Sequence, residues 1–184
     1  MRDLSWKIIS SNYVYEKKWL HVKTDTCQLP DGRIIEPYFV IEAPDFCNTI
    51  VVTQEEKIIL VRQYRHPIQS VTYELPGGVI EVGEDPAVAA LREMEEETGY
   101  VSTEIEYLFK AATNPALNTS TAYFYLVKNA QQITKRRLDD LEDIDVVSFS
   151  KEEFIQLLAD NKLQHGVQLG AIYEAMIRLN WLRY

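Results

Sequence analysis

The stretch from Gly77 to Tyr100 constrains the fold more strongly than any other part of the chain. It opens on a glycine pair and passes into a run whose apolar residues recur at the spacing of one helix face: Ala87, Ala90, Leu91 and Met94. Asp85 and Pro86 suit the start of a helix, and Gly99 suits its end. The stretch therefore predicts a loop, a helix over 86–98 and a second loop.

Strands are predicted on both sides of this helix. The apolar, β-branched runs 48–53 and 57–65 are typical of buried strands, and the Asp-Gly pair at 31–32 is typical of a hairpin turn. The charged segment 134–145 predicts a loop. The remaining predicted elements are strands at 6–15, 19–29, 34–42, 70–75, 101–113 and 121–128 and helices at 151–160 and 167–182. Their order predicts a mixed α/β domain with helices packed on sheets.

Composition and charge argue against several classes of protein. The chain is 46% hydrophobic and carries a net charge of −9, which disfavours binding to nucleic acids and anionic membranes. A bound cation can still reverse the local sign for an anionic substrate. Cys27 and Cys47 have no metal-binding spacing, and no run approaches the ~18 apolar residues of a membrane span. We expect a cytoplasmic protein with reduced thiols, no signal peptide, no nucleic-acid partner and no membrane partner.

Three glutamates of the predicted helix share one strip beside its apolar stripe. At about 100° per residue, Glu93, Glu96 and Glu97 lie close together, whereas Glu95 points to the other side. Like charges at these spacings destabilise a helix by about 0.2–0.5 kcal/mol per pair. A hard divalent cation would turn the repulsion into attraction, because Mg2+ prefers oxygen ligands. The alternative is an acidic helix face that is simply solvated.

The residues around these glutamates match a known motif. The pattern G-x5-E-x7-R-E-U-x-E-E-x-G-U, in which U is bulky and apolar or aromatic, is satisfied by Gly78, Glu84, Arg92, Glu93, Met94, Glu96, Glu97, Gly99 and Tyr100. This stretch resembles the Nudix box of the Nudix hydrolases. The resemblance implies the Nudix fold, an α/β/α sandwich with a mixed β-sheet. It also implies that Mg2+ or Mn2+ is bound and that a diphosphate linked to another moiety is hydrolysed.

The resemblance also implies a role for each matching residue. Glu93, Glu96 and Glu97 correspond to the metal-binding glutamates, and Glu97 counts as catalytic as well. The backbone carbonyl of Gly77 corresponds to a further metal ligand. The structural positions of the box are Glu84, Arg92 and Gly99, of which Glu84 and Arg92 brace the loop against the helix. Gly78, together with Gly77, lets the main chain approach a phosphate closely.

Residues outside the box resemble one branch of the family. "VRQYRHP" at 61–67, "YELPGG" at 73–78, the N-terminal "LPDGRIIEPYFV" and Pro115 are similar to the ADP-ribose pyrophosphatase-like, nucleoside diphosphate-sugar branch. This resemblance implies that Arg65 contacts the substrate beside the diphosphate and that Glu74 lies near the site. The alternatives are a surface ion pair for Arg65 and a structural carboxylate for Glu74.

The same branch implies a domain organisation and an assembly. A small N-terminal β-subdomain, residues 1–45, would serve dimerisation and substrate contacts. The Nudix hydrolase domain would follow over 46–184. Members of the branch are commonly homodimers, so we expect a homodimer whose substrate is a small nucleotide sugar.

The substrate is less constrained than the reaction. The branch often carries "SPG" and a nearby glutamate where this chain has "NPALNTSTAYF" at 114–124, so both the glycine and the acid are missing. We expect hydrolysis of ADP-ribose to AMP and ribose 5-phosphate. The alternatives are GDP-mannose, a dinucleotide or a flavin as substrate, or a ligand sensor without catalysis. A sensor would be expected to have lost metal ligands, and all three glutamates are present.

The general base is predicted on the acidic loop. The branch commonly takes its base from a loop resembling D-E-x-E-x-I-x-V, which aligns with "EDIDV" here and puts the candidate acids on Glu142 and Asp140. Glu142 ranks first, because aspartate is one methylene shorter. The alternatives are another residue, a metal-bound hydroxide that needs no side chain as base, or a loop whose acids are merely solvated.

Overall fold

The structure is a computed structural model that describes residues 1–18, 20–133, 135–138 and 142–182. The chain forms two compact units. The first combines Met1–Pro44 with Ala112–Thr121, and the second combines Asp45–Ala111 with Ala122–Tyr184. In the described part of the chain, no helix is both long enough and apolar enough to cross a membrane.

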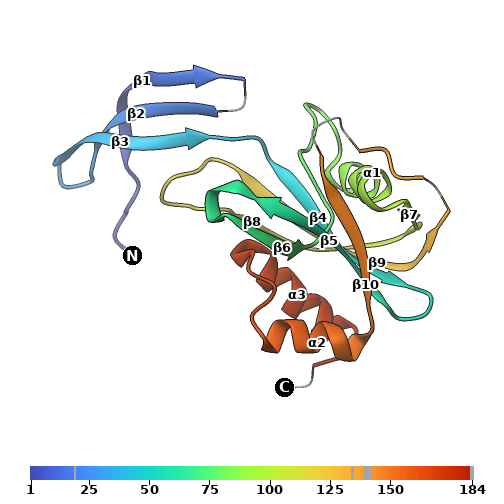
Figure 1. The fold of residues 1–184 in the computed structure, drawn as a ribbon. Helices are drawn as coiled ribbons and strands as arrows, with labels where there is room; N and C mark the ends of the chain where they lie inside the picture. Colours follow the sequence, from blue (N-terminus) through green and yellow to red (C-terminus); the bar gives the residue numbers. More distant parts are fainter. Residues whose placement is uncertain (19, 134, 139–141, 183–184) are drawn as a thin grey trace. The chain divides into compact units, whose positions relative to one another are not determined.

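The first unit is a three-stranded antiparallel sheet (Figure 1). Its strands are β1 (Lys7–Lys17), β2 (Leu20–Gln28) and β3 (Ile34–Glu42), in that order. Gly32 closes the predicted hairpin turn with a φ of 88°, a conformation that favours glycine. The segment 112–121 joins β3 through two backbone hydrogen bonds of Ile41, to Leu117 and from Thr119.

The second unit contains a seven-stranded mixed sheet with the path β10-β5-β4-β9-β7. β6 pairs with β5, and β8 pairs with β9. The strands are β4 (Phe46–Thr53), β5 (Ile58–Arg65), β6 (Ser70–Glu74), β7 (Tyr100–Val101), β8 (Glu104–Ala112), β9 (Thr121–Gln132) and β10 (Ile144–Phe149). β4 and β9 run parallel, whereas β5 is antiparallel to β4, β6 and β10.

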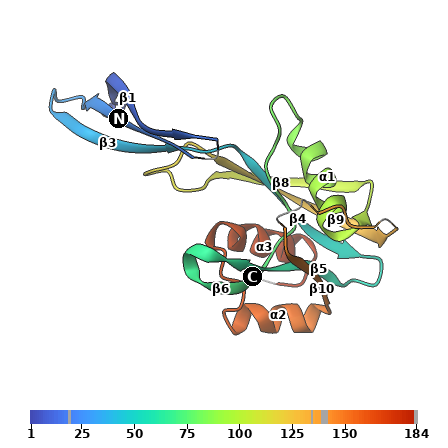
Figure 2. The same cartoon turned by 45° about the horizontal axis from the view of Figure 1, so that its top comes forward.

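Helices cover both faces of this sheet. α1 (Pro86–Thr98) lies on one face, and α2 (Lys151–Ala159) and α3 (Gly166–Arg178) lie on the other (Figures 1 and 2). Alternate side chains of a strand point to opposite faces, so Ile58 and Leu60 join the core under α2 and α3 while Ile59 joins the core under α1. The predicted α/β/α sandwich with a mixed sheet is thereby confirmed.

Three predicted elements differ from the structure. The predicted loop 134–145 runs into β10, which was not predicted, because the acidic residues before Ile144 obscure a short alternating strand. The predicted strand 101–113 is divided into β7 and β8 by the two residues 102–103. The predicted final helix 167–182 ends at Arg178, and Asn180 adopts a φ of 57° that does not continue a right-handed helix.

Candidate active site

The ends of α1 are set by its capping residues. The carboxylate of Asp85 accepts a hydrogen bond from the backbone N–H of Ala87 at 2.8 Å, which satisfies one of the free donors at the start of the helix. Gly99 ends the helix with a φ of 73°. Met94, which belongs to the apolar stripe of the helix, is fully buried in the core between α1 and the sheet. The helix predicted over 86–98 has these same bounds.

The carboxylate of Glu97 is buried beside the glycine pair. Its residue is only 5% exposed, and the backbone N–H of Gly77 donates to Oε2 at 2.8 Å. No other hydrogen bond to this carboxylate comes from the described residues. Burial raises the pKa of Glu97 to about 8, and the charges of Glu93 and Glu142 act in the same direction while Arg65 opposes them. A buried carboxylate with so little compensation is a group that a bound cation would stabilise.

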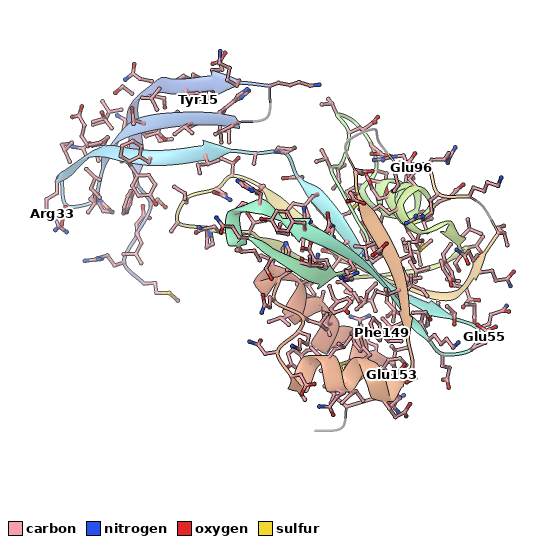
Figure 3. All side chains as sticks on the ribbon, viewed as in Figure 1. Tyr15, Arg33, Glu55, Glu96, Phe149 and Glu153 are labelled. Atoms are coloured by element: carbon pink, nitrogen blue, oxygen red, sulfur yellow. The ribbon has the colours of Figure 1, made fainter. Side chains whose placement is uncertain are left out.

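Arg92 connects the other acids of the motif. Its guanidinium donates to both carboxylate oxygens of Glu84, at 2.9 Å each, and this pairing lowers the pKa of Glu84 to about 2. It also donates to Glu93 at 2.7 Å and to Glu96 at 3.1 Å. A fifth contact, to the carbonyl of Val79 at 3.2 Å, joins it to the loop before the helix. Figure 3 labels Glu96 on α1.

The three glutamates predicted as metal ligands lie on one helix, but their carboxylates do not come together at one point. Among the described residues, no three carboxylate, histidine or cysteine side chains are gathered for a metal ion. Glu93 and Glu96 instead contact Arg92, and Glu97 contacts Gly77. The physical reason is charge: carboxylates without a cation repel one another, and a guanidinium is the nearest cation available to two of them.

Their chemistry nevertheless suits a hard divalent ion. All of the predicted ligand atoms are oxygens, the donors that Mg2+ prefers. Burial also raises the pKa of Glu93, with Arg92 opposing this shift. Burial disfavours the charged forms of both Glu93 and Glu97, and a bound cation would stabilise those charged forms. The residues therefore fit a divalent metal ion, provided that the side chains of Glu93 and Glu96 turn away from Arg92.

Both residues of the glycine pair sit where a side chain would clash. A Cβ on Gly77 would lie 2.0 Å from the carbonyl oxygen of Cys47, at a backbone φ of 154°. A Cβ on Gly78 would lie 2.6 Å from the carboxylate of Glu93. Glycine at 77 lets the loop pack against β4, and glycine at 78 leaves room for a predicted metal ligand.

Hydrogen bonds attach the segment 75–78 to the sheet and to α3. The contacts are Leu75 N–H to Gln168 Oε1 (2.9 Å), Asn48 Nδ2 to Leu75 O (3.4 Å), Thr49 N–H to Pro76 O (2.9 Å) and Cys47 N–H to Gly78 O (2.9 Å). The peptide group that joins Gly77 to Gly78 is different. Neither its carbonyl nor its N–H has a hydrogen-bond partner among the residues that the structure describes.

Arg65 and Glu74 are brought together at one edge of the sheet. Arg65 donates to the two carboxylate oxygens of Glu74 at 2.8 and 2.6 Å, and the hydroxyl of Thr72 donates to the same carboxylate at 2.6 Å. Burial alone would raise the pKa of Glu74, but the hydrogen bonds from Arg65 and Thr72 outweigh it and lower the pKa. The side chain of Glu74 is 3% exposed and that of Arg65 is 46% exposed. Glu74 thus holds the guanidinium of Arg65 in place, while part of the Arg65 side chain stays exposed to solvent.

One of the two candidate bases lies within the described residues. Glu142 is exposed, and its charge acts to raise the pKa of both Glu93 and Glu97, which indicates that its carboxylate lies near them. Asp140 lies outside the described residues. In the predicted loop 134–145, to which both candidate acids belong, the backbone N–H of Arg137 donates to the carbonyl of Glu96 at 2.9 Å.

Two protein-family models match this chain. Residues 47–167 match the NUDIX domain, and residues 6–41 match the nucleoside diphosphate sugar hydrolase N-terminal domain. The chain belongs to the Nudix hydrolase family. The predictions of a Nudix hydrolase and of its ADP-ribose pyrophosphatase-like branch are confirmed. Nudix hydrolases generally need divalent metal ions, in agreement with the oxygen-rich site.

Several Nudix hydrolases and other proteins are similar over most of the chain. The ADP-ribose pyrophosphatase of Bacillus subtilis (strain 168) is 29% identical, over 96% of this chain and 98% of its own. The methanol dehydrogenase activator of Bacillus methanolicus is 31% identical over 90% of each chain. The ADP-sugar pyrophosphatase of Mus musculus is 32% identical over 82% of this chain and 76% of its own. The crystal structure of an ADP compounds hydrolase has the same fold, with a TM-score of 0.84 at 18% identity over 98% of this chain and 97% of that one.

Two residues that hold the glycine loop were missed by the sequence analysis. Asn48 and Gln168 are 4% and 3% exposed and belong to no motif. Gln168 did carry a signal, because it occupies the buried face of α3 at helical spacing from Ala171, Ile172 and Ala175. A polar residue on such a face needs a hydrogen-bond partner. Asn48 interrupts an apolar strand in the same way.

Proposed function

We propose that the protein hydrolyses the diphosphate bond of a nucleoside diphosphate sugar, with ADP-ribose as the substrate and AMP and ribose 5-phosphate as the products. The observation that carries this proposal is the buried carboxylate of Glu97, which accepts a hydrogen bond from Gly77 and has its pKa raised to about 8. Such a group is suited to a metal ion that binds a diphosphate. The relative from Bacillus subtilis, whose match covers 98% of its own length, is named an ADP-ribose pyrophosphatase, and this name supports ADP-ribose as the substrate.

We propose Mg2+, or Mn2+ in its place, as the ion. Glu93, Glu96, Glu97 and the carbonyl of Gly77 would hold it. When bound, the ion neutralises the diphosphate, polarises a phosphorus centre and lowers the pKa of water. The carbonyl of Gly77 has no hydrogen-bond donor among the described residues, which supports its assignment as a ligand.

The chain's own side chains would bind the substrate and move the proton. Arg65, held in place by Glu74, would direct its exposed edge to the substrate beside the diphosphate. The N–H of Gly78, which has no partner among the described residues, would donate to a phosphate oxygen, as main-chain donors near glycines often do. Glu142 would accept the proton of the attacking water, since a general base must lie within hydrogen-bond reach of it.

A comparison of substrates tests the specificity. With Mg2+ present, ADP-ribose should be cleaved to AMP and ribose 5-phosphate with a higher kcat/KM than GDP-mannose, a dinucleotide or a flavin dinucleotide. Products are resolved by mass. If GDP-mannose is turned over far faster while ADP-ribose is inert, the proposed substrate is wrong, and the altered segment 116–120 becomes the candidate specificity element. Binding of nucleotide sugars without turnover of any would instead identify a sensor.

We also propose that residues 1–45 form a dimerisation subdomain and that the protein is a homodimer. Every residue of β1 is exposed, including Ile8, Tyr13 and Val14 at more than half of their surface; Tyr15, labelled in Figure 3, belongs to the same strand. Several exposed apolar side chains on one strand favour an interaction site. Sedimentation at micromolar concentration should give the mass of two chains. A monomer under those conditions would reject the proposal.

A further inference from the structure

The backbone of Leu75 lies between two buried side chains from different elements. Its N–H donates to Oε1 of Gln168 in α3 at 2.9 Å, and its carbonyl accepts from Nδ2 of Asn48 in β4 at 3.4 Å. Leu75, Gln168 and Asn48 are 2%, 3% and 4% exposed. All three residues are therefore screened from bulk solvent.

The two bonds act on a very short segment. Pro76 follows Leu75, and its carbonyl is held by the backbone N–H and the hydroxyl of Thr49, at 2.9 and 3.3 Å. The N–H of Gly77 then donates to Glu97 at 2.8 Å. The backbone polar groups before the Gly77–Gly78 peptide group, from the N–H of Leu75 to the N–H of Gly77, are thus all hydrogen-bonded. That peptide group alone within the segment has both its carbonyl and its N–H unpartnered among the described residues.

We infer that Gln168 is a positioning residue for the metal site, and that Asn48 assists it from the opposite side. Gln168 holds the N–H of Leu75, so that the turn cannot rotate and the carbonyl of Gly77 keeps a fixed orientation. This inference rests on the proposed function, because it assigns to a residue of α3 the alignment of a proposed metal ligand.

The chemistry of the position separates this role from simple packing. Ala171, Ile172 and Ala175 occupy the same buried face of α3 and are apolar. Burying a glutamine among them costs free energy through lost side-chain entropy and desolvation, and its bond to Leu75 offsets this cost. Hydrogen bonds around a metal ligand commonly set the ligand's orientation, and Gln168 would act on Gly77 through the two residues of backbone that separate Gly77 from Leu75.

Mn2+ binding to the full-length protein, measured by electron paramagnetic resonance without substrate, tests the inference. Gln168→Met keeps the length of the side chain and removes the acceptor. It should weaken Mn2+ binding by about 10-fold, the lower end of the range for losing a direct partner of a metal ligand, because Gln168 acts two residues before Gly77. Gln168→Glu keeps the acceptor oxygen and should bind Mn2+ more tightly than Gln168→Met. Asn48→Leu, which removes the donor to the same Leu75 backbone, should also weaken binding and serves if Gln168→Met does not fold.

Phe154→Leu is the matched control. Phe154 of α2 is 1% exposed in the same core and lies outside the proposed site, so its variant should lower the Tm while Mn2+ binding stays at the wild-type level. The inference is overturned if Gln168→Met binds Mn2+ like the wild type, or if Phe154→Leu weakens Mn2+ binding as much at a similar Tm. A wild-type protein that binds no Mn2+ would overturn the proposed function itself and this inference with it, so the two failures are distinguishable.

Discussion

Replacing Glu97 by glutamine should abolish hydrolysis while leaving the metal-free protein at least as stable as the wild type. The loss of activity is expected because the variant removes a proposed metal ligand. Metal ions commonly supply several kcal/mol of transition-state stabilisation, which corresponds to a decrease on the order of 10³-fold in kcat. Glu93→Gln should behave in the same way, because burial also raises the pKa of Glu93.

The effect of Glu97→Gln on stability has a defined pH dependence. The folded protein holds the proton of Glu97 up to a pKa of about 8, above the ordinary glutamate value of 4.5. The folded state therefore binds more protons than the unfolded state between these values, and the wild type loses stability as the pH rises through this window. Glutamine has no charge to bury, so the Tm of the variant in EDTA should exceed that of the wild type by an amount that grows up to about pH 8.

Glu95→Gln is the matched control for this prediction. Glu95 lies on the same helix, outside the proposed ligands, and its carboxylate pairs with the exposed Arg137 at 3.3 Å. Its variant should keep most of the wild-type activity and should show no such pH-dependent gain in Tm. A Glu97→Gln variant with wild-type kcat, or one that is less stable than the wild type in EDTA near pH 8, would contradict the proposed role of Glu97.

Glu142→Gln should decrease kcat by about 10²–10⁴-fold, the typical contribution of a general base. Metal affinity should be almost unchanged, because Glu142 is not a proposed ligand. Its exposed carboxylate acts on the pKa of both Glu93 and Glu97, which places it near the proposed metal site. Asp140→Asn should have the smaller effect, because the aspartate side chain is shorter by one methylene.

Both variants are measured separately as kcat at saturating Mg2+, so that a change in metal affinity does not imitate the loss of a base. The reverse order of effects would assign the base to Asp140. If both variants keep more than about a tenth of the wild-type kcat, the loss is smaller than general base catalysis supplies, and the assignment of the base to this loop is wrong.

Local signals in the sequence predicted the central helix well. The bounds of α1 follow from neighbouring residues, Asp85 and Pro86 at the start and Gly99 at the end, so no distant contact is needed to place them. The mixed α/β class was also predictable from the order of the strand and helix patterns, whereas the α/β/α sandwich followed from the resemblance to the Nudix hydrolases. β10 was missed because its six residues follow an acidic segment. Its pairing with β5, which lies far away in the sequence, stabilises it as a strand.

The side-chain contacts of the site were less predictable. The motif spacing places Glu93 and Glu96 on one strip, but it does not reveal that Arg92 contacts both of them as well as Glu84. That outcome depends on side-chain rotamers and on the local balance of charge. The bond between Gln168 and Leu75 joins residues from opposite halves of the chain, and only the tertiary fold brings them together.

Product analysis of the wild-type protein with ADP-ribose, in Mg2+ and in EDTA, tests metal-dependent hydrolysis of the diphosphate most directly. The proposed site predicts AMP and ribose 5-phosphate in equal amounts when Mg2+ is present, no products in EDTA, and recovery when Mg2+ is added back in excess. Full activity in EDTA would contradict a reaction that depends on Glu93, Glu96 and Glu97 as metal ligands, and cleavage at any bond other than the diphosphate would contradict the proposed reaction.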